Sequence, residues 1–401
     1  MKSIEEQIKI ISKGVDEIIG LDDLKIKLEN SIKNNKPLIV KLGLDPSAPD
    51  IHLGHTVVLR KMKQLQDLGH KVIIIIGDFT GKIGDPTGKS KARKALSTEK
   101  VLENAKTYEE QILKILDKDK TEIVFNSSWL SKLSFEEAIG LASITTVARM
   151  LEREDFKNRY ENQMPISLHE FFYPLMQGFD SVQIKADIEL GGTDQRFNVL
   201  MGRTLQKEFD QSPQATIFMP LLEGLDGKDK MSKSLGNYIG IDEKASVMYE
   251  KAMTIPDELI IKYFELVTDI HPDEVEKINK DLCENNTNPR DIKMSLAKEI
   301  VRLYHGEEEA IAAENRFKEV FQKGQIPNDI KCIEVLKDKF DLFEELINNN
   351  LVSSKSEIRR LINQGGLKIN NEKITDIQSL IIEENMIVQV GKKKFIKIHL
   401  N

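Results

Sequence analysis

Two short stretches decide the fold of this 401-residue chain: His52-Leu53-Gly54-His55 and Lys230-Met231-Ser232-Lys233-Ser234. The first follows a predicted buried strand, residues 38–44, and opens a predicted helix that runs to about residue 68. A strand, a loop and a helix N-terminus that carries a glycine form a nucleotide site, because backbone amides and the helix dipole attract phosphate. The second stretch lies among glycines, which predicts a mobile loop that closes over phosphates. Two imidazoles and two lysines would supply positive groups where charge builds on a leaving phosphate group.

The composition is that of an ordinary multidomain protein. The length predicts two or three domains, and 40% hydrophobic with 31% charged residues is typical of soluble chains. The longest apolar run, residues 72–76, is too short to span a membrane, and the N-terminus with its early acids does not resemble a secretory signal. Cys283 and Cys332 match no metal-ligand spacing and are typical of a reducing compartment. We therefore expect a cytoplasmic protein without a protein-bound metal.

The charge of −7 is unevenly distributed along the chain. Residues 351–401 contain nine Lys and Arg against five Asp and Glu, a balance of +4, so the rest carries −11. Within this tail, residues 353–366 predict a serine-capped basic helix that ends at two glycines, and short strands follow. A basic module on an acidic body is what a local polyanion site looks like. As a bare charge cluster, however, it would more often be a solvated face.

The order of predicted elements indicates an α/β protein whose first domain is a Rossmann-like parallel sheet. The continuous apolar run at residues 71–77 is typical of a parallel strand that is covered on both faces. Residues 242–322 have the pattern of successive helices. We expect a catalytic domain, a helical domain, a linker and a small α+β domain, at residues 1–239, 240–325, 326–339 and 340–401.

The densest aromatic stretch, residues 169–180, predicts a small-molecule pocket. Tyr173, Gln177 and Asp180 stand at i, i+4 and i+7, so a helix would point all three polar groups in one direction. Apolar surroundings with a few convergent polar groups describe a ligand site. On this stretch alone, a core helix with a wet edge is an equally good interpretation.

The motif that follows, residues 189–195, favours the pocket. It is a strand end that opens into a helix, and Gly191 and Gly192 remove side chains beside a ligand. Asp194 can accept hydrogen bonds from ribose hydroxyls, and Gln195 can reach a carboxylate or a ring hydroxyl.

An apparent P-loop ending, Gly88-Lys89-Ser90, is rejected because the required glycine is replaced by Ile83. Asp85 in the same stretch is either a site residue or a turn residue that stabilises its own backbone. We expect the lone tryptophan, Trp129, to be a packing residue.

The two nucleotide motifs resemble the paired signatures of the class I aminoacyl-tRNA synthetases, with a Leu for the usual Ile of the first motif. The residue 173–180 block and the Gly-Gly-Thr-Asp-Gln motif narrow the resemblance to bacterial tyrosyl-tRNA synthetases, over essentially the whole chain. The tail resembles the S4 RNA-binding module. This resemblance implies activation of L-tyrosine by ATP with Mg²⁺, transfer to the 3′ end of tRNA(Tyr), and a homodimer whose interface comes from residues 135–159.

The resemblance also implies a role for each site residue. Charge on the phosphates would be stabilised by His52, His55, Lys230 and Lys233. The ATP site would comprise Asp45, Gly54, Gly192, Asp194, Met231, Ser232, Lys233 and Ser234. The tyrosine site would comprise Lys41, Asp85, Tyr173, Gln177, Asp180 and Gln195, with Asp180 accepting from the phenol hydroxyl. The tRNA would be faced by Lys355, Arg359 and Arg360.

Two positions depart from the better-known form of the family. Lys41 replaces a tyrosine that often shares the phenol hydroxyl, and Glu189 replaces a pocket glutamine, as in the second bacterial branch. Three other functions remain open: a tryptophanyl-tRNA synthetase, an RNA-binding or intron-folding protein on a synthetase scaffold, and a small-molecule adenylate-forming ligase. Asp180 and the tail favour tyrosine over tryptophan. The intact motifs argue against the second alternative, and the long helical and basic C-terminal third argues against the third.

Overall fold

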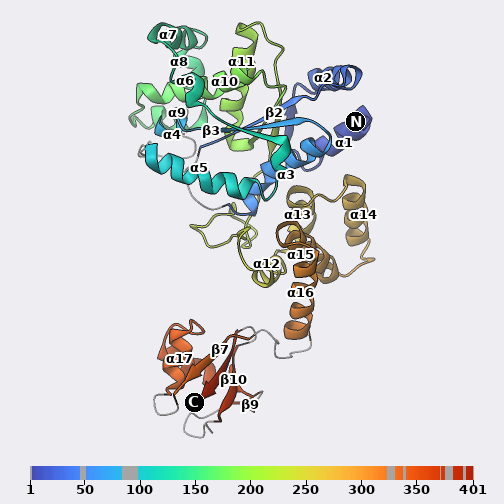
Figure 1. The fold of residues 1–401 in the computed structure, drawn as a ribbon, viewed down its shortest axis with the longest axis vertical. Helices are drawn as coiled ribbons and strands as arrows, with labels where there is room; N and C mark the ends of the chain where they lie inside the picture. Colours follow the sequence, from blue (N-terminus) through green and yellow to red (C-terminus); the bar gives the residue numbers. More distant parts are fainter. Residues whose placement is uncertain are drawn as a thin grey trace. The chain divides into compact units, whose positions relative to one another are not determined.

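The structure, a computed structural model (Figure 1), describes residues 2–45, 51–83, 98–322, 330–336, 340–370, 372–374, 383–391 and 394–400. The chain divides into two compact units, residues 1–306 and 307–401. Within the described ranges, no helix combines the length and the apolar character needed to cross a bilayer.

The first unit is built on a six-stranded sheet in the order β1-β6-β5-β2-β3-β4. Five of these strands are parallel, as expected for apolar segments that are covered on both faces. Their bounds are Ile39–Leu44 for β2, Lys71–Ile76 for β3, Thr121–Phe125 for β4, Ile188–Gly192 for β5 and Ala215–Met219 for β6. The chain moves outward from β2 to β4 and returns to β5 on the other side of β2. The carboxyl ends of β2 and β5 therefore flank the point at which such sheets bind ligands.

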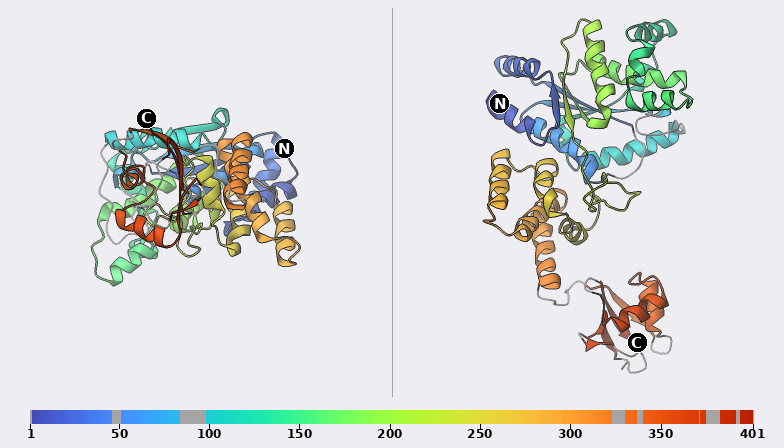
Figure 2. Two further views of the ribbon diagram at one scale, coloured as in Figure 1. Left: turned by 90° about the horizontal axis from the view of Figure 1, so that it is seen from below. Right: turned by 180° about the vertical axis from the view of Figure 1, so that it is seen from behind.

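Helices cover both faces of this sheet, with α10 and α11 on one side and α3 and α5 on the other (Figures 1 and 2). The confirmed fold class is thus α/β with a parallel sheet. The bounds are Leu53–Asp67 for α3, Thr98–Ile112 for α5, Phe172–Ile184 for α10 and Arg196–Glu208 for α11. The smaller elements between them are η1 (Lys118–Lys120), α4 (Thr80–Ile83), α6 (Ser127–Leu130), η2 (Leu168–Phe171) and η3 (Thr193–Gln195).

Two segments are built from short elements whose boundaries carry little signal in the sequence. Residues 1–35 form α1 (Ile4–Ser12) and α2 (Leu21–Asn34), but Glu17–Ile19 between them is the strand β1, antiparallel to β6. So short an edge strand carries no periodicity of its own. Residues 135–161 are three short helices, α7 (Phe135–Ser143), α8 (Val147–Met150) and α9 (Glu154–Glu161). The chain breaks at Thr146, whose side chain accepts a hydrogen bond from the Arg149 amide and starts α8 as its N-cap.

Four helices complete the first unit: α12 (Ala245–Ala252), α13 (Ile260–Val267, after the short η4 at Asp257–Leu259), α14 (Pro272–Cys283) and α15 (Pro289–His305). They are tied to α3, the helix that begins at the first motif. Arg60 forms an ion pair with Asp269 at 3.0 Å, and the hydroxyl of Tyr304 bonds to Thr56 at 3.1 Å. The helical segment and the nucleotide motif are therefore held together by polar contacts.

The second unit begins with α16 (Glu307–Phe317) and a π-helical turn at Lys318–Gln322. Its sheet has the order β7-β11-β10-β8-β9, with β7 at Cys332–Val335, β8 at Leu367–Ile369, β9 at Glu372–Lys373, β10 at Asn385–Val390 and β11 at Lys394–Leu400. The helices α17 (Leu342–Asn348) and α18 (Lys355–Asn363) share one apolar core with this sheet.

The expected linker at residues 326–339 needs a correction, because it contains β7. This strand pairs in parallel with β11, so that Cys332 faces Lys397. A four-residue edge strand whose partner lies some sixty residues away gives only a weak local signal. The helix α17 was likewise not expected.

Candidate active site

A cavity of about 330 Å³ opens at the carboxyl ends of β2 and β5, where the topology predicts a ligand. Most of the residues expected in the tyrosine and ATP sites line it together. They come from β2, the start of α3, α10 and the β5–η3 turn: Asp45, Gly54, His55, Tyr173, Gln177, Asp180, Gly192, Asp194 and Gln195. Of the other expected site residues, Asp85 lies outside the described residues.

Asp180 is the buried carboxylate of this cavity. Its oxygens accept hydrogen bonds from Trp129 Nε1 at 2.8 Å and from Asn126 Nδ2 at 3.3 Å. Burial raises the pKa of Asp180 to about 7, and the positive charge of Lys41 opposes that rise. Trp129 is thus more than the expected packing residue. Sequence reasoning also missed Asn126, because both donors reach Asp180 only through the tertiary fold.

Asp45 connects the two expected subsites. Its carboxylate accepts hydrogen bonds from the Tyr173 hydroxyl and from Thr80 Oγ1, both at 2.9 Å. A Cβ atom at Gly77 would lie 1.9 Å from Asp45 Oδ1, so only glycine leaves room for this arrangement. The residue that we assigned to ATP therefore also orients a residue that we assigned to tyrosine.

Lys41 lies behind the cavity wall rather than on it. Its side chain is fully buried, and its ammonium group bonds to Gln177 O at 2.9 Å, Ser181 Oγ at 2.7 Å and Glu189 Oε1 at 2.9 Å. Neither Lys41 nor Glu189 is among the residues that line the cavity.

The first motif caps helix α3. His52 Nδ1 accepts from the Gly54 amide at 3.1 Å, and His55 Nδ1 accepts from the His52 amide at 3.3 Å. The two ring centroids are 3.9 Å apart. A side chain at Gly54 would come within 3.0 Å of the His52 ring, which explains the glycine between the histidines.

The surroundings of the two histidines favour the neutral imidazole over the positive form that we expected from the sequence. Burial is the largest cause, and together with the neighbouring Lys233 it lowers the pKa of His52 to about 3 and that of His55 to about 4. Because each Nδ1 accepts a hydrogen bond, each Nε2 carries the proton. Both rings can therefore donate Nε2–H to a phosphate oxygen, while the positive charge comes from the lysines.

The second motif lies beside the first, although the two are far apart in sequence. The Leu53 amide donates to Ile239 O at 2.9 Å, and a Cβ atom on Gly54 would lie 3.4 Å from Met231 Cβ. Lys230 and Lys233 are exposed, and Lys233 Nζ stands 5.8 Å from the centre of the Tyr238 ring. Lys233 is thus close enough to act on the charge of both histidines, and neither lysine lines the cavity.

A buried asparagine that sequence reasoning did not single out organises this lysine loop. Asn237 Oδ1 accepts from the Ser232 amide at 2.8 Å, and Asn237 Nδ2 donates to Lys230 O at 3.3 Å. A Cβ atom on Gly224 would come within 2.3 Å of the Asn237 side chain. The position of the asparagine directly after Gly236 was the available sequence signal.

The β5–η3 turn brings the remaining polar groups to the rim. A side chain at Gly192 would come within 2.5 Å of Asp194 Oδ1, and Gln195 Oε1 accepts from Asn198 Nδ2 at 3.0 Å. Ser232 Oγ and Ser234 Oγ lie 2.9 Å apart in the lysine loop.

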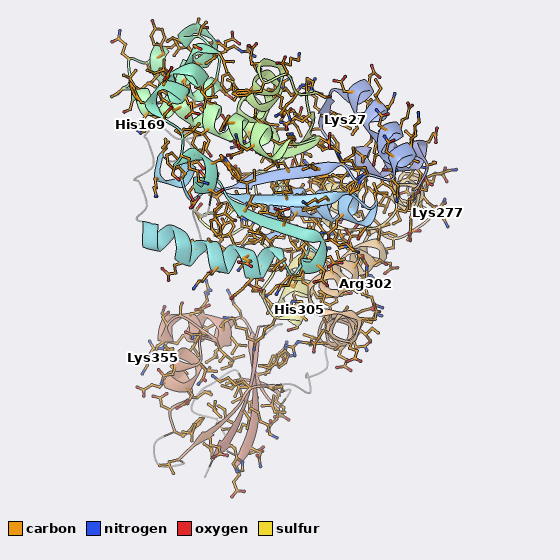
Figure 3. The ribbon with its side chains drawn as sticks, turned by 45° about the horizontal axis from the view of Figure 1, so that its top comes forward. Lys27, His169, Lys277, Arg302, His305 and Lys355 are labelled. Carbon is orange, nitrogen blue, oxygen red and sulfur yellow. The ribbon has the colours of Figure 1, made fainter. Side chains whose placement is uncertain are left out.

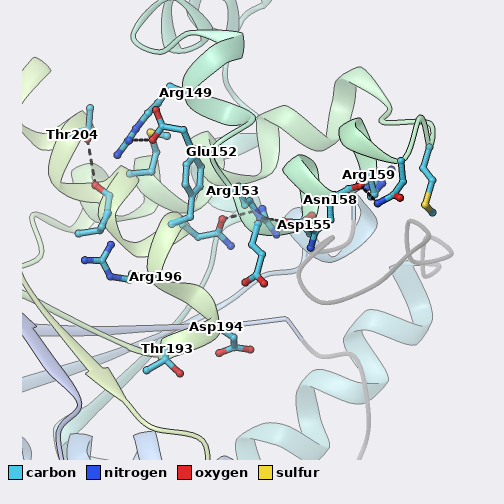
Figure 4. Close-up of a pocket in the computed structure, with 17 residues that line it drawn as sticks. Arg149, Glu152, Arg153, Asp155, Asn158, Arg159, Thr193, Asp194, Arg196 and Thr204 are labelled. Carbon is cyan, nitrogen blue, oxygen red and sulfur yellow. Dashed lines mark hydrogen bonds and ion pairs between the residues drawn. The ribbon is translucent and has the colours of Figure 1, made fainter.

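A second and larger cavity, of about 720 Å³, lies between α8, α9 and α11 and shares Asp194 with the first (Figure 4). Several of its charged side chains pair with one another or with neighbours. Arg149 pairs with Glu152, and Arg153 contacts both Asp155 and Asn198. None of the residues that line it belongs to the two nucleotide motifs. The smaller cavity is therefore the candidate active site.

The three residues expected to face tRNA lie on α18 of the second unit. Lys355, Arg359 and Arg360 are all exposed, and Lys355 lies at the surface of this unit (Figure 3). Lys355 Nζ is 3.6 Å from Glu344 and 3.9 Å from Asp341. Such exposed pairs contribute little to stability, so the basic side chains can exchange partners.

Comparison with known proteins agrees with this geometry. The family described as "tRNA synthetases class I (W and Y)" matches residues 33–322, and "Tyrosine--tRNA ligase SYY-like C-terminal domain" matches residues 322–398. "Tyrosine--tRNA ligase 2" of Clostridium acetobutylicum is 64% identical over 398 residues, 99% of each chain. The tyrosine–tRNA ligase of Thermotoga maritima is 50% identical over 98% of this chain and 97% of its own.

Solved structures show the same fold. A C-terminally truncated mitochondrial tyrosyl-tRNA synthetase of Aspergillus nidulans has a TM-score of 0.65 at 24% identity, over 80% of this chain and 95% of its own. The tyrosyl-tRNA synthetase of Archaeoglobus fulgidus, complexed with L-tyrosine, has a TM-score of 0.62 at 22% identity, over 78% of this chain and 100% of its own. The relatives match this chain over nearly its full length, and the two family models match its two parts. The chain therefore belongs to the tyrosine–tRNA ligases of the class I tRNA synthetase family.

Proposed function

We propose that this protein activates L-tyrosine with ATP, forming tyrosyl-AMP and pyrophosphate, and transfers the tyrosyl group to the 3′ end of tRNA(Tyr). One observation carries the proposal: two motifs distant in sequence meet beside a cavity that contains a buried carboxylate, Asp180. A nucleotide phosphate chain and a phenol side chain fit the two parts of this site.

In the proposed tyrosine subsite, Asp180 accepts the hydrogen bond of the phenol hydroxyl. Trp129 and Asn126 hold its carboxylate in place through one bond to each oxygen. Tyr173 and Gln177, with Asp85, would take the amino group. Phenylalanine would leave Asp180 without its partner, and discrimination between these two amino acids by tyrosyl-tRNA synthetases is itself a standard example of this effect.

In the proposed ATP subsite, the carboxylate of tyrosine attacks the α-phosphorus and pyrophosphate leaves. His52 and His55 donate Nε2–H to phosphate oxygens, and Lys230 and Lys233 offset the charge that grows on the leaving group. Asp194 accepts from the ribose, and Gly54 and Gly192 allow the nucleotide to approach the backbone. Mg²⁺ enters as the ATP complex, held by phosphate oxygens as is usual for this ion.

The second unit would bind the tRNA. We propose that residues 340–401, together with the strand β7, form an S4-like module, with the exposed Lys355, Arg359 and Arg360 on α18 facing the nucleic acid. The catalytic domain would comprise residues 1–239, and the helical domain that contacts the anticodon stem would comprise residues 240–325. Since ATP and tRNA are the proposed substrates, we propose that the protein acts in the cytoplasm.

We also propose a homodimer that is formed through the expected residues 135–159, extended by the exposed Tyr160 and Leu168. Large apolar side chains are exposed there, with Phe135 at 83% and Leu168 at 78%, together with Ile139, Val147 and Tyr160. Monomeric proteins seldom leave so many large apolar side chains exposed on one segment. A second copy of the chain would cover them.

ATP–pyrophosphate exchange with each of the twenty amino acids tests the proposed function. We expect exchange with tyrosine alone. A signal with tryptophan instead would favour the tryptophanyl alternative, and no exchange with any amino acid would leave an RNA-binding scaffold. The named relatives are all tyrosine–tRNA ligases, and none supports either alternative.

A further inference from the structure

Lys41 and Glu189 form an ion pair inside the sheet. They stand opposite each other on the parallel strands β2 and β5. Lys41 Nζ lies 2.9 Å from Glu189 Oε1, and the side chains are 0% and 1% exposed, respectively. Removing two charges from water costs more than such a pair usually returns, so apolar residues could often replace it without loss of stability. A functional role is therefore a better explanation for this pair than stability.

The pair is anchored to α10, around the turn that carries Asp180. The Lys41 ammonium group forms an ion pair with Glu189 Oε1 and donates hydrogen bonds to Gln177 O and to Ser181 Oγ. These contacts hold it behind the cavity wall. Ser181 Oγ in turn donates to Glu189 Oε2 at 3.0 Å, which Gln214 Nε2 also contacts. The network thus contacts helix α10 on both sides of Asp180, at Gln177 and at Ser181.

The neighbouring helix α11 leaves space for this network at Gly202. A Cβ atom there would lie 2.9 Å from Ser181 Oγ, 3.1 Å from Glu189 Oε2 and 2.5 Å from Gln214 Nε2. The members of the network are accordingly buried, with 0% exposure for Lys41, Ser181 and Gln214 and 1% for Glu189.

The charges around Asp180 come from these same two residues. Among the described titratable groups on the elements that pack against α10, Lys41 on β2 and Glu189 on β5 act on the Asp180 carboxyl, and Trp129 and Asn126 are neutral donors. Burial favours the protonated form, the Lys41 charge opposes it, and Glu189 has a smaller effect in the same direction as burial. The net effect of the pair is to favour the ionised carboxylate.

We propose that Lys41 and Glu189 are positioning residues for tyrosine recognition, which hold the turn of α10 that carries Asp180 so that its carboxylate accepts the phenol hydroxyl. This inference rests on the proposed role of Asp180 in the tyrosine subsite. The pair acts on the substrate only through Asp180.

The test is the KM for tyrosine as a function of pH, measured by ATP–pyrophosphate exchange on the full-length protein. In Lys41→Met/Glu189→Gln, we expect KM near pH 7 to rise about fivefold with kcat within about twofold, and the pH at which KM reaches its low plateau to rise by about one unit. By about pH 8.5 the variant's KM should return to that of the unaltered protein, because Asp180 is then ionised in both.

Glu189→Gln alone is the matched variant, for which we expect the pH profile of KM to shift in the opposite direction. It removes the negative charge and replaces one acceptor oxygen by an N–H donor while keeping the shape of the side chain. Loss of the negative charge should let the plateau be reached at a lower pH than in the unaltered protein. Loss of folding in the double variant would leave this single, nearly isosteric variant as the deciding arm. An unchanged profile in Glu189→Gln, or a KM rise in the double variant that is equal at every pH, overturns the proposal.

Asp180→Asn separates this inference from the proposed function. We expect a much higher KM for tyrosine, without the pH dependence. If Asp180→Asn keeps both the normal KM and the normal profile, the proposed tyrosine subsite itself is wrong. If Asp180→Asn behaves as expected but Glu189→Gln and the double variant keep the normal profile, only the role of the buried pair is wrong.

Discussion

At the scale of single residues, the positive charge of the proposed phosphate site would come from its lysines, because burial lowers the pKa of His52 to about 3 and that of His55 to about 4. Lys233→Ala should therefore lower the rate of pyrophosphate exchange about a hundredfold or more, the size typical of losing one contact to developing charge. Tyrosine binding should hardly change, because Lys233 is exposed and does not line the cavity. Near-normal exchange in this variant would remove the proposed role of the lysine.

His70 lies away from the candidate site, and its burial should make the stability of the fold depend on pH. Its Nε2 bonds to Gln7 Oε1 at 3.0 Å, and burial lowers its pKa to about 4 from an ordinary value of 6.5. Between those two pH values the unfolded chain holds the proton and the folded one does not, so the free energy of unfolding falls as pH is lowered from about 6.5 to 4.

His70→Gln should make this pH dependence shallower, because one of the buried imidazoles is gone. Urea unfolding at a series of pH values measures it. An identical slope in the variant and the unaltered protein would show that His70 is not kept neutral by the fold.

At the scale of elements, the conformation of the lysine loop, residues 230–234, depends on hydrogen bonds from one asparagine, Asn237. Asn237→Ala removes the bonds to the Ser232 amide and to Lys230 O. We expect kcat for exchange to fall about tenfold, the equivalent of one or two lost hydrogen bonds, with the KM for tyrosine unchanged. Asn286→Ala, at an exposed asparagine of the same unit, is the control and should have no effect. A rise in the KM for tyrosine with kcat intact would contradict this role.

Elements with strong local patterns were predictable from the sequence, and short paired ones were not. The continuous apolar run of β3 and the helical spacing of polar groups in α10 are both local signals. By contrast, β1 and β7 are edge strands of three and four residues that form only because a distant strand pairs with them.

The candidate site follows the same division. The placing of Tyr173, Gln177 and Asp180 in one cavity follows from helix spacing, which is local. The contact of Trp129 with Asp180 and the pairing of Lys41 with Glu189 depend on tertiary packing and on the register between β2 and β5. No local pattern encodes that register, so the sequence could suggest these residues without assigning their partners.

At the scale of the whole molecule, amino-acid activation and tRNA binding should be separable. Reversing charge in Arg359→Glu/Arg360→Glu should raise the KM for tRNA about tenfold or more and weaken its dependence on salt, because phosphate contacts are lost. Pyrophosphate exchange should stay unchanged. The control Lys25→Glu/Lys33→Glu on α2 makes the same change of charge and should leave the KM for tRNA as it was. Equal effects of both pairs would reduce the role of α18 to net charge.

The central claim is that both motifs and the Asp180 cavity serve a single tyrosyl-adenylate. A crystal structure of the protein with a non-hydrolysable tyrosyl-adenylate analogue tests this most directly. We predict the phenol oxygen within hydrogen-bond distance of Asp180 and the phosphate group beside His52 and His55. An analogue bound in the larger cavity near Arg149, or with its ring turned away from Asp180, would contradict the claim.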